Sequence, residues 1–146
     1  MAGFVVVDAS VAVKWLAVEE YTREANALVR HWLTENIQMV APHHMRVEVA
    51  NALYKRMVRG EHTIENVVSG VESLLAINIE FRDVSGLHIR AVQLASELRQ
   101  SAVYDAHYLA LAESLGGELW TADQRFHRVA SDASYPVHWV GDFVAN

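Results

Sequence analysis

Four carboxylates stand at places in the sequence from which their side chains could act together on one ligand. Asp8 ends the strand-like run VVVDAS, Asp123 ends the run ELWTAD, Asp105 opens the apolar segment VYDAHYLALA, and Glu48 lies within VEVANAL. Carboxylates that lie close together repel one another unless a cation or bound protons compensate their charge. Oxygen ligands of this kind suit Mg²⁺ or Mn²⁺, and such a site can activate water against a phosphodiester. These residues, the acidic quartet, are the candidate catalytic and metal-binding group.

Each acid also has a simpler explanation when it is considered alone. Asp8 and Asp123 each precede a predicted helix, where an aspartate caps backbone amides and meets the positive end of the helix dipole. Asp105 stands in the first turn of its helix, where acids are favoured, although a lone buried carboxylate is costly unless it is paired or metal-bound. Glu48 heads a polar stripe that could simply face water. The acids become a site only if the fold brings them together.

The elements that must position these acids alternate along the chain. Strands are predicted at 4–7, 37–42, 79–84, 118–123 and 137–140, and helices at 11–18, 19–36, 43–59, 63–78, 86–100, 103–116 and 124–131. Such alternation predicts an α/β fold with a parallel sheet covered by helices on both faces, and the first strand reads as fully buried. Ligands of these sheets bind outside the carboxyl ends of the strands, where Asp8 and Asp123 are expected.

Composition and charge narrow the class of protein. The 146 residues are 52% hydrophobic, which suits one domain over 1–146 with a proper core. There is no cysteine, so a metal would be held by oxygen or imidazole. The net charge of −6 argues against binding nucleic acid through sheer basicity. If several carboxylates bind cations, however, this formal charge overstates how negative the surface is. No run is long enough to cross a bilayer and the start does not resemble a signal peptide, so we expect a cytoplasmic protein without membrane contact.

Four motifs in one order carry a resemblance to a known family. VVVDASVAVKW, VEVANAL, YDAHYLALAE and LWTADQRF, spread over nearly the whole chain, resemble the PIN domain and, within that family, the VapC-type toxins of bacterial toxin–antitoxin pairs. The acidic positions of the family fall on Asp8, Glu48, Asp105 and Asp123, and its small polar positions fall on Ser10 and Thr121.

The resemblance implies a three-layer PIN-like fold of about five parallel strands in the order 3-2-1-4-5. It also implies an endoribonuclease that depends on Mg²⁺ or Mn²⁺, forms a homodimer and is inhibited by a small antitoxin at the acidic cleft. In this interpretation Asp8, Asp105 and Asp123 ligate the metal directly or through water. Glu48 ligates it or positions the attacking water. Ser10 and Thr121 hold carboxylates or waters by hydrogen bonds.

Basic residues and histidines lie near the acids in sequence. Lys55, Arg56 and Arg59 follow Glu48 on the same helix and are predicted to contact RNA phosphates, although they could equally form an ordinary solvated face. His43 and His44 are adjacent, so their side chains diverge on a helix and cannot chelate one ion together. His107 is expected to point away from the cleft, about 200° around the helix from the acid two residues before it. We expect structural or solvent roles for these histidines.

Two other functions compete with the nuclease interpretation. A phosphoryl-transfer domain with a strand-end aspartate nucleophile would need a second acid two residues after Asp8, where the chain has Ser10. A non-catalytic module of the same fold could bind RNA or protein. The complete acidic quartet argues against such a module, because carboxylates repel phosphate unless a metal is present. The sequence specifies neither the RNA that is cut nor the antitoxin.

Overall fold

One parallel sheet organises the molecule in a computed structural model that describes residues 3–144. Its five strands lie in the order β3-β2-β1-β4-β5, which confirms the predicted order. They are β1 (Phe4–Val7), β2 (Gln38–Ala41), β3 (Ile79–Phe81), β4 (Glu118–Thr121) and β5 (Val137–Trp139), and each neighbouring pair is parallel. The predicted strands at 37–42, 79–84 and 118–123 were too long, because the chain leaves the sheet as soon as it turns toward the next helix.

The described residues form seven α-helices. They are α1 (Ala9–Leu16), α2 (Thr22–Thr34), α3 (Met45–Val58), α4 (Ile64–Ala76), α5 (Leu87–Glu97), α6 (Tyr104–Leu115) and α7 (Gln124–Asp132), followed by the short 3-10 helix η1 (Val140–Asp142). The helix predicted at 11–18 begins two residues earlier, because Asp8 caps it directly. The helix predicted at 19–36 begins only at Thr22, since Tyr21 adopts a left-handed φ of 66°. Within residues 3–144 no helix has the length and apolar character to cross a membrane.

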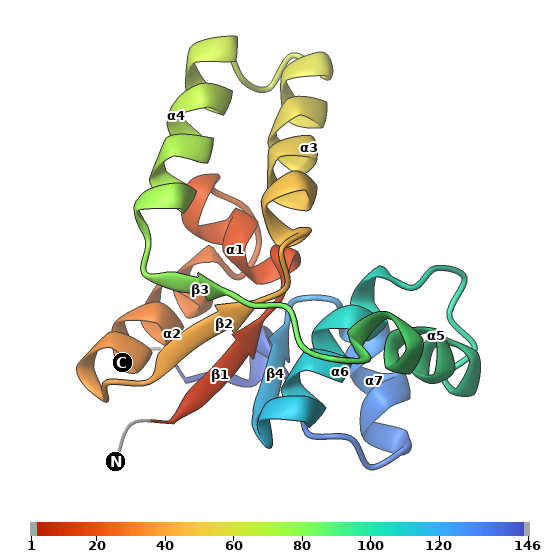
Figure 1. The fold of residues 1–146 in the computed structure, drawn as a ribbon. Coiled ribbons are helices and arrows are strands. Elements are labelled where there is room, and N and C mark those ends of the chain that lie inside the picture. The colour runs from red at the N-terminus through yellow and green to blue at the C-terminus, as the bar shows by residue number, and fades with distance from the viewer. Residues whose placement is uncertain (1–2, 145–146) are drawn as a thin grey trace.

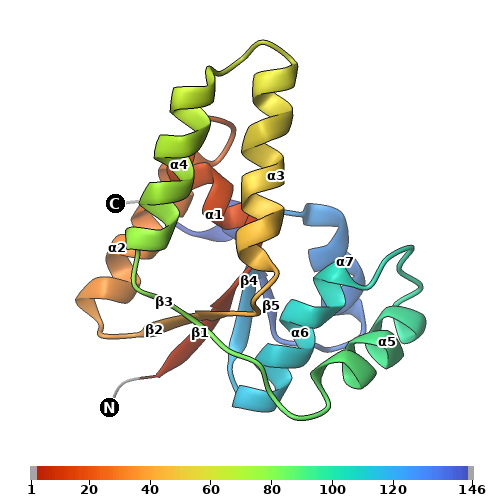
Figure 2. The same cartoon turned by 45° about the horizontal axis from the view of Figure 1, so that its top comes forward.

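The order of the strands places the helices in two groups. Right-handed crossovers carry α1 to α4 between β1, β2 and β3, and α5 to α7 between β3, β4 and β5. Figure 1 and Figure 2 show the first group on one side of the sheet and the second group on the other. The antiparallel pair α3 and α4 extends beyond the carboxyl ends of the strands (Figure 1).

The core covers both faces of the sheet, and β1 and α6 are its most buried elements. Val5, Val6 and Val7 are buried, whereas Phe4 is 43% exposed, so the prediction of a fully buried first strand was wrong at its first residue. In α6 every side chain from Ala106 to Ala112 is buried, because this helix packs against β1 and β4 and against α5. Each large apolar side chain buried in this way stabilises the fold by about 1.5–3 kcal/mol. This packing fixes the amino end of α6, which carries Asp105, at the carboxyl edge of the sheet.

Candidate active site

Asp8 is a buried carboxylate that caps a helix. Its backbone is extended at the end of β1, and its Oδ1 accepts a hydrogen bond from the backbone amide of Val11 at 3.2 Å. The same oxygen accepts a bond from the hydroxyl of Ser10 at 2.5 Å. The capping explanation is therefore confirmed for Asp8. Capping does not require burial, however, and this side chain is only 3% exposed.

The surroundings of Asp8 make its charge expensive. Its pKa is raised from the ordinary 3.8 to about 7. Burial is the largest cause and the negative charge of Asp105 adds to it, whereas bonds from the hydroxyls of Ser10 and Thr121 and from the Val11 amide oppose the rise. A carboxylate that titrates so close to neutral pH is typical of functional sites. Asparagine could also cap the helix at this position, so capping alone does not explain the buried carboxylate.

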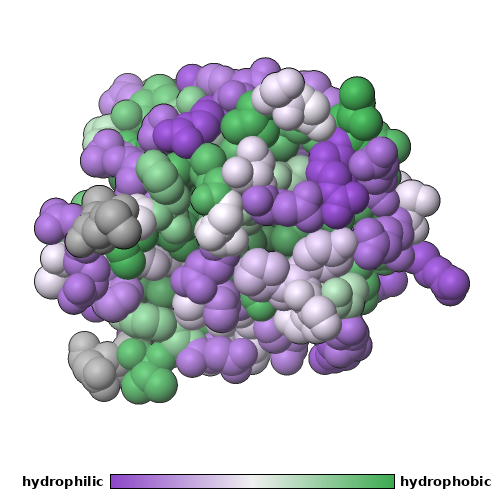
Figure 3. All heavy atoms as spheres, turned by 60° about the horizontal axis from the view of Figure 1, so that its bottom comes forward, coloured by the Kyte–Doolittle hydropathy of each residue, from purple (hydrophilic) through white to green (hydrophobic). Residues whose placement is uncertain are grey.

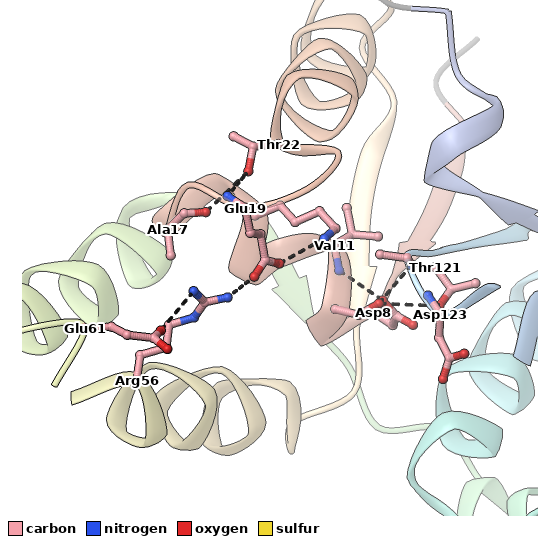
Figure 4. A network of polar contacts seen from close by, with 12 residues as sticks. Asp8, Val11, Ala17, Glu19, Thr22, Arg56, Glu61, Thr121 and Asp123 are labelled. Atoms are coloured by element: carbon pink, nitrogen blue, oxygen red, sulfur yellow. Dashed lines mark hydrogen bonds and ion pairs between the residues drawn. The ribbon is translucent and has the colours of Figure 1, made fainter. Parts of the chain in front are cut away.

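Two hydroxyls join the turn after β1 to the turn after β4. Ser10 Oγ accepts a hydrogen bond from the amide of Ala122 at 2.9 Å and lies 3.4 Å from Thr121 Oγ1. Thr121 Oγ1 in turn accepts a bond from the amide of Asp123 at 3.0 Å. Figure 4 shows Asp8, Thr121 and Asp123 gathered at one end of this network. The two strand-end aspartates are thus held beside each other by Ser10 and Thr121.

Asp123 repeats the arrangement of Asp8 at the next strand. It caps α7, and its Oδ1 accepts a hydrogen bond from the amide of Phe126 at 3.0 Å. The capping explanation holds here as well. Because both caps use Oδ1, the same side chain can cap a helix and present its second oxygen to a ligand.

Asp105 links the members of the acidic quartet electrostatically. Its pKa is raised from 3.8 to about 6, mainly by burial and also by the charges of Asp123 and Glu48, whereas the nearby His44 opposes the rise. Asp8 is in turn influenced by Asp105. Asp8, Glu48 and Asp123 therefore each lie close enough to Asp105 for one charge to affect the other.

Glu48 is held by two residues that the sequence interpretation did not assign to the site. The hydroxyl of Tyr108 donates a hydrogen bond to its Oε1 at 2.8 Å. His44 Nε2 lies 3.0 Å from the same oxygen, although its ring is not aligned for a hydrogen bond. We expected a structural or solvent role for His44, and the structure places its ring beside Glu48. Its spacing of four residues from Glu48 could have indicated the His44 contact, whereas the spacing of three between Asp105 and Tyr108 indicates only that these two residues share a helix face.

Burial and neighbouring charge keep Tyr108 protonated. The side chain is 1% exposed. Burial first, and then the negative charges of Glu48 and Asp8, raise its pKa above the ordinary value for tyrosine. The protonated phenol donates its hydrogen bond to Glu48.

A groove borders the acidic quartet on the side of α3. It has a volume of about 510 Å³. It is lined by Val47, Glu48, Asn51, Ala52, Lys55 and Tyr104. The polar stripe predicted on this helix therefore faces a groove. The exposed ring of Tyr104 from α6 forms its other wall.

The basic residues of α3 differ in how they are bound. Arg56 forms one ion pair with Glu19, in the segment between α1 and α2, and another with Glu61. Arg59 Nε also lies 2.9 Å from a carboxylate oxygen of Glu61. Glu19 also binds the buried Lys14 at 2.9 Å, so Arg56 completes a network that ties α1 to α3 (Figure 4). Burial lowers the pKa of Lys14, which makes the partner carboxylate necessary. Arg56 thus has a structural contact, whereas Lys55 faces the groove.

His107 takes the structural place predicted for it. Its Nδ1 lies 2.6 Å from the carbonyl oxygen of Val103 in its own helix, and its Nε2 lies 2.9 Å from His88 Nδ1 on α5. These bonds join α5 to α6 behind the acidic quartet.

The donor set fits a hard divalent cation in its chemistry. Carboxylate and hydroxyl oxygens are the ligands that Mg²⁺ and Mn²⁺ prefer, and two of the carboxylates carry raised pKa values that a cation would reverse. Within residues 3–144, however, no three His, Asp or Glu side chains are already arranged as a group that could hold a metal ion. The quartet shares an electrostatic environment without forming a finished ligand shell.

A second hollow lies at the opposite end of the sheet. It has a volume of about 640 Å³, and Phe4, Trp32, Gly117 and Pro136 are among the residues that line it at the amino ends of the strands. Figure 3 views this end of the molecule, where hydrophobic and hydrophilic residues are interspersed. Its two acids are paired, Glu113 with Arg90 at 2.7 Å and Glu118 with His138 at 2.8 Å. Because both acids already have partners here, the chemistry points to the carboxyl edge instead.

Comparison with known proteins agrees with this geometry. The family model of the PIN domain matches residues 5–132. This chain belongs to the PIN domain family. Ribonuclease VapC3 of Mycobacterium tuberculosis is 35% identical to it over 124 residues, which is 85% of each chain. The predicted resemblance is confirmed.

Solved structures of PIN proteins share the fold. VapBC2 from Rickettsia felis, bound to a DNA fragment from the promoter, aligns with a TM-score of 0.68 at 13% identity and covers 93% of this chain and 98% of that one. VapC20 of Mycobacterium tuberculosis, a toxin that cleaves the sarcin-ricin loop, aligns with a TM-score of 0.65 at 17% identity and covers 97% and 98%. At these identities the likeness shows that the PIN fold is shared.

Proposed function

We propose that this PIN protein is a VapC-type endoribonuclease that hydrolyses RNA phosphodiesters with the help of Mg²⁺ or Mn²⁺. The observation that carries the proposal is the electrostatic coupling of Asp8, Glu48 and Asp123 to Asp105 at one edge of the sheet. The similarity to ribonuclease VapC3 supports the same conclusion. Acids that only capped helices would need neither the burial of Asp8 nor this mutual proximity.

The acidic quartet supplies the ligands in this proposal. Asp8, Asp105 and Asp123 would hold the cation directly or through water, and Glu48 would hold it or orient the attacking water. A bound divalent ion lowers the pKa of water and screens the charge that develops on the phosphodiester. Because uncompensated carboxylates repel one another, we expect the quartet to close around the ion.

The neighbouring residues keep the acids in place while the reaction proceeds. Ser10 and Thr121 bind the Asp8 carboxylate and link the two strand-end turns, so Asp8 is held in place and the backbone of Asp123 is fixed beside it. Buried valines beneath Asp8 exclude water from the strand side. The open edge of the site is where RNA would lie.

The groove beside Glu48 suits a single RNA strand. Lys55 would neutralise a backbone phosphate, and the exposed ring of Tyr104 offers a face on which an unpaired base can stack. Arg59 is exposed and can add a second phosphate contact once it leaves Glu61. We propose no direct phosphate contact for Arg56, which is bound between Glu19 and Glu61.

We also propose that the protein acts in the cytoplasm and that it has two protein partners there. A small antitoxin would cover the groove, because α3 exposes the apolar side chains of Val47 and Val58 beside it. A second copy of the chain would cover another apolar face, such as that of Ile89 and Val92 on α5. Titration with the antitoxin and sedimentation of the free protein test these two partners separately.

Cleavage of a single-stranded RNA pool tests the activity itself. We expect cutting with added Mn²⁺ or Mg²⁺, none in EDTA, and none for Asp8→Asn or Asp105→Asn. Glu113→Gln is the matched control, because this acid lies on the same helix as Asp105 but pairs with Arg90 on the surface. Metal-dependent binding of RNA without cleavage would favour the non-catalytic module instead.

A further inference from the structure

Tyr108 occupies a position that links the two helices of the site. It lies three residues after Asp105 on α6, so both side chains project from the same face of that helix. Its hydroxyl reaches Glu48, sixty residues away in the chain on α3. One side chain thus connects the helix that carries Asp105 with the helix that carries Glu48.

The contacts of Glu48 fall on one of its two oxygens. Tyr108 donates to Oε1 at 2.8 Å, and His44 Nε2 lies 3.0 Å from the same atom. Within residues 3–144 no hydrogen bond is formed to Oε2. A carboxylate fixed through one oxygen has a defined plane and presents the other oxygen in a single direction. A free glutamate would lose several rotamers when it bound a ligand, at a cost in affinity.

Packing alone does not explain the hydroxyl. The ring of Tyr108 lies in the core, where the ring of a phenylalanine would bury the same apolar surface. A buried hydroxyl must find a partner, and here that partner is a glutamate of the site. The arrangement resembles the outer hydrogen bonds that orient ligating side chains around metal ions.

We propose that Tyr108 is a positioning residue, whose hydroxyl orients Glu48 so that its free oxygen faces the divalent cation or its water. This inference rests on the proposed function, because it needs the quartet to bind a cation. It assigns a role to a residue outside the quartet, and it makes that role depend on Glu48 alone.

Binding of Mn²⁺ in the absence of RNA tests this role without relying on activity. Calorimetric titration of the whole chain should show that Tyr108→Phe weakens Mn²⁺ binding by about 10- to 100-fold. Tyr135→Phe is the matched control, because it removes a tyrosine–glutamate bond, that to Glu97 at 2.9 Å, far from the site. Its Mn²⁺ affinity should equal that of the wild type.

A double-mutant cycle separates orientation of Glu48 from a general structural effect. In a Glu48→Gln background, Tyr108→Phe should have almost no further effect on Mn²⁺ affinity, because the group that it orients has lost its charge. Additive losses in the cycle, or an unchanged affinity in Tyr108→Phe, would overturn the proposal.

A second variant covers the case in which Tyr108→Phe does not fold. 4-Aminophenylalanine at the same position keeps a hydrogen-bond donor, so this variant should bind Mn²⁺ within a few fold of the wild type. Loss of Mn²⁺ binding in this variant would refute the role of Tyr108. Failure of the wild type to bind Mn²⁺ would instead refute the proposed function, and this inference with it.

Discussion

Replacing Asp8 by asparagine should make the metal-free protein more stable while it removes the activity. Asparagine keeps the size of the side chain and an oxygen that can accept the bonds of Ser10 and Val11. It removes a carboxylate that burial makes costly to ionise. The substitution therefore separates the demands of the fold from those of the reaction.

The magnitude follows from the pKa of Asp8. Its pKa is about 7 in the folded protein and 3.8 in the unfolded chain, and each unit is worth about 1.36 kcal/mol. Because the folded pKa is the higher one, stability is greatest when the proton is bound, falls as the pH rises from 3.8 to about 7, and stays constant above that. Asp8→Asn should thus be more stable than the wild type by about 4 kcal/mol at pH 8, and this advantage should shrink by about 3 kcal/mol at pH 5.

Urea unfolding followed by circular dichroism measures this difference. Both proteins are unfolded in EDTA at pH 8, 7, 6 and 5, so that other titrating groups cancel in the comparison. Asp83→Asn is the control, because this aspartate is exposed and its replacement should leave the pH dependence unchanged. The reasoning is refuted if Asp8→Asn is less stable than the wild type at pH 8, or if its advantage is the same at pH 5 and pH 8.

Three further outcomes can be checked with simple assays. Ser10→Ala leaves the amide of Ala122 without its partner and removes one of the bonds to Asp8 Oδ1, so the free energy of unfolding should fall by about 1–3 kcal/mol in urea; an unchanged value would contradict the link between the turns. Lys55→Ala should weaken RNA binding and reduce the slope of log affinity against log salt by about 0.7 in filter binding, and an unchanged slope would remove it from the RNA path. Calorimetric Mn²⁺ affinity should fall about 100-fold from pH 7.5 to 5.5, because protons compete for Asp8 and Asp105, whose pKa values are about 7 and about 6. An affinity independent of pH would show that the metal binds elsewhere.

The alternation of strands and helices could be predicted because the sequence repeats its signals locally, whereas the order of the strands was predicted only from the resemblance to the PIN family. Runs such as VVV and ELW form strands that are short and mostly buried, and helical periodicity fills the intervals between them. The strand-end positions of Asp8 and Asp123 followed directly from this alternation. The left-handed Tyr21, which delays the start of α2, has no such local signal, because left-handed conformations are rare outside glycine and asparagine.

The partners of the acids could not be predicted in the same way. Tyr108 and Glu48 are sixty residues apart, and only the packing of α6 beside α3 brings them together. Arg56 looked available for RNA, but it pairs with Glu19 from a different segment. A sequence pattern shows which residues lie on the same face of one helix. The residues of other elements that contact this face depend on the tertiary fold.

The most direct test of the account is a crystal structure of the protein soaked in Mn²⁺, with anomalous diffraction to locate the ion. The account predicts an anomalous peak among Asp8, Asp105, Asp123 and Glu48, with carboxylate oxygens at about 2.0–2.2 Å from the ion, as for other small oxygen-bound divalent ions. The same soak of Asp8→Asn should give a weaker peak or none. A strong peak elsewhere on the chain, or an ordered quartet that stays apart in saturating Mn²⁺, would contradict the proposal that these acids form a metal centre.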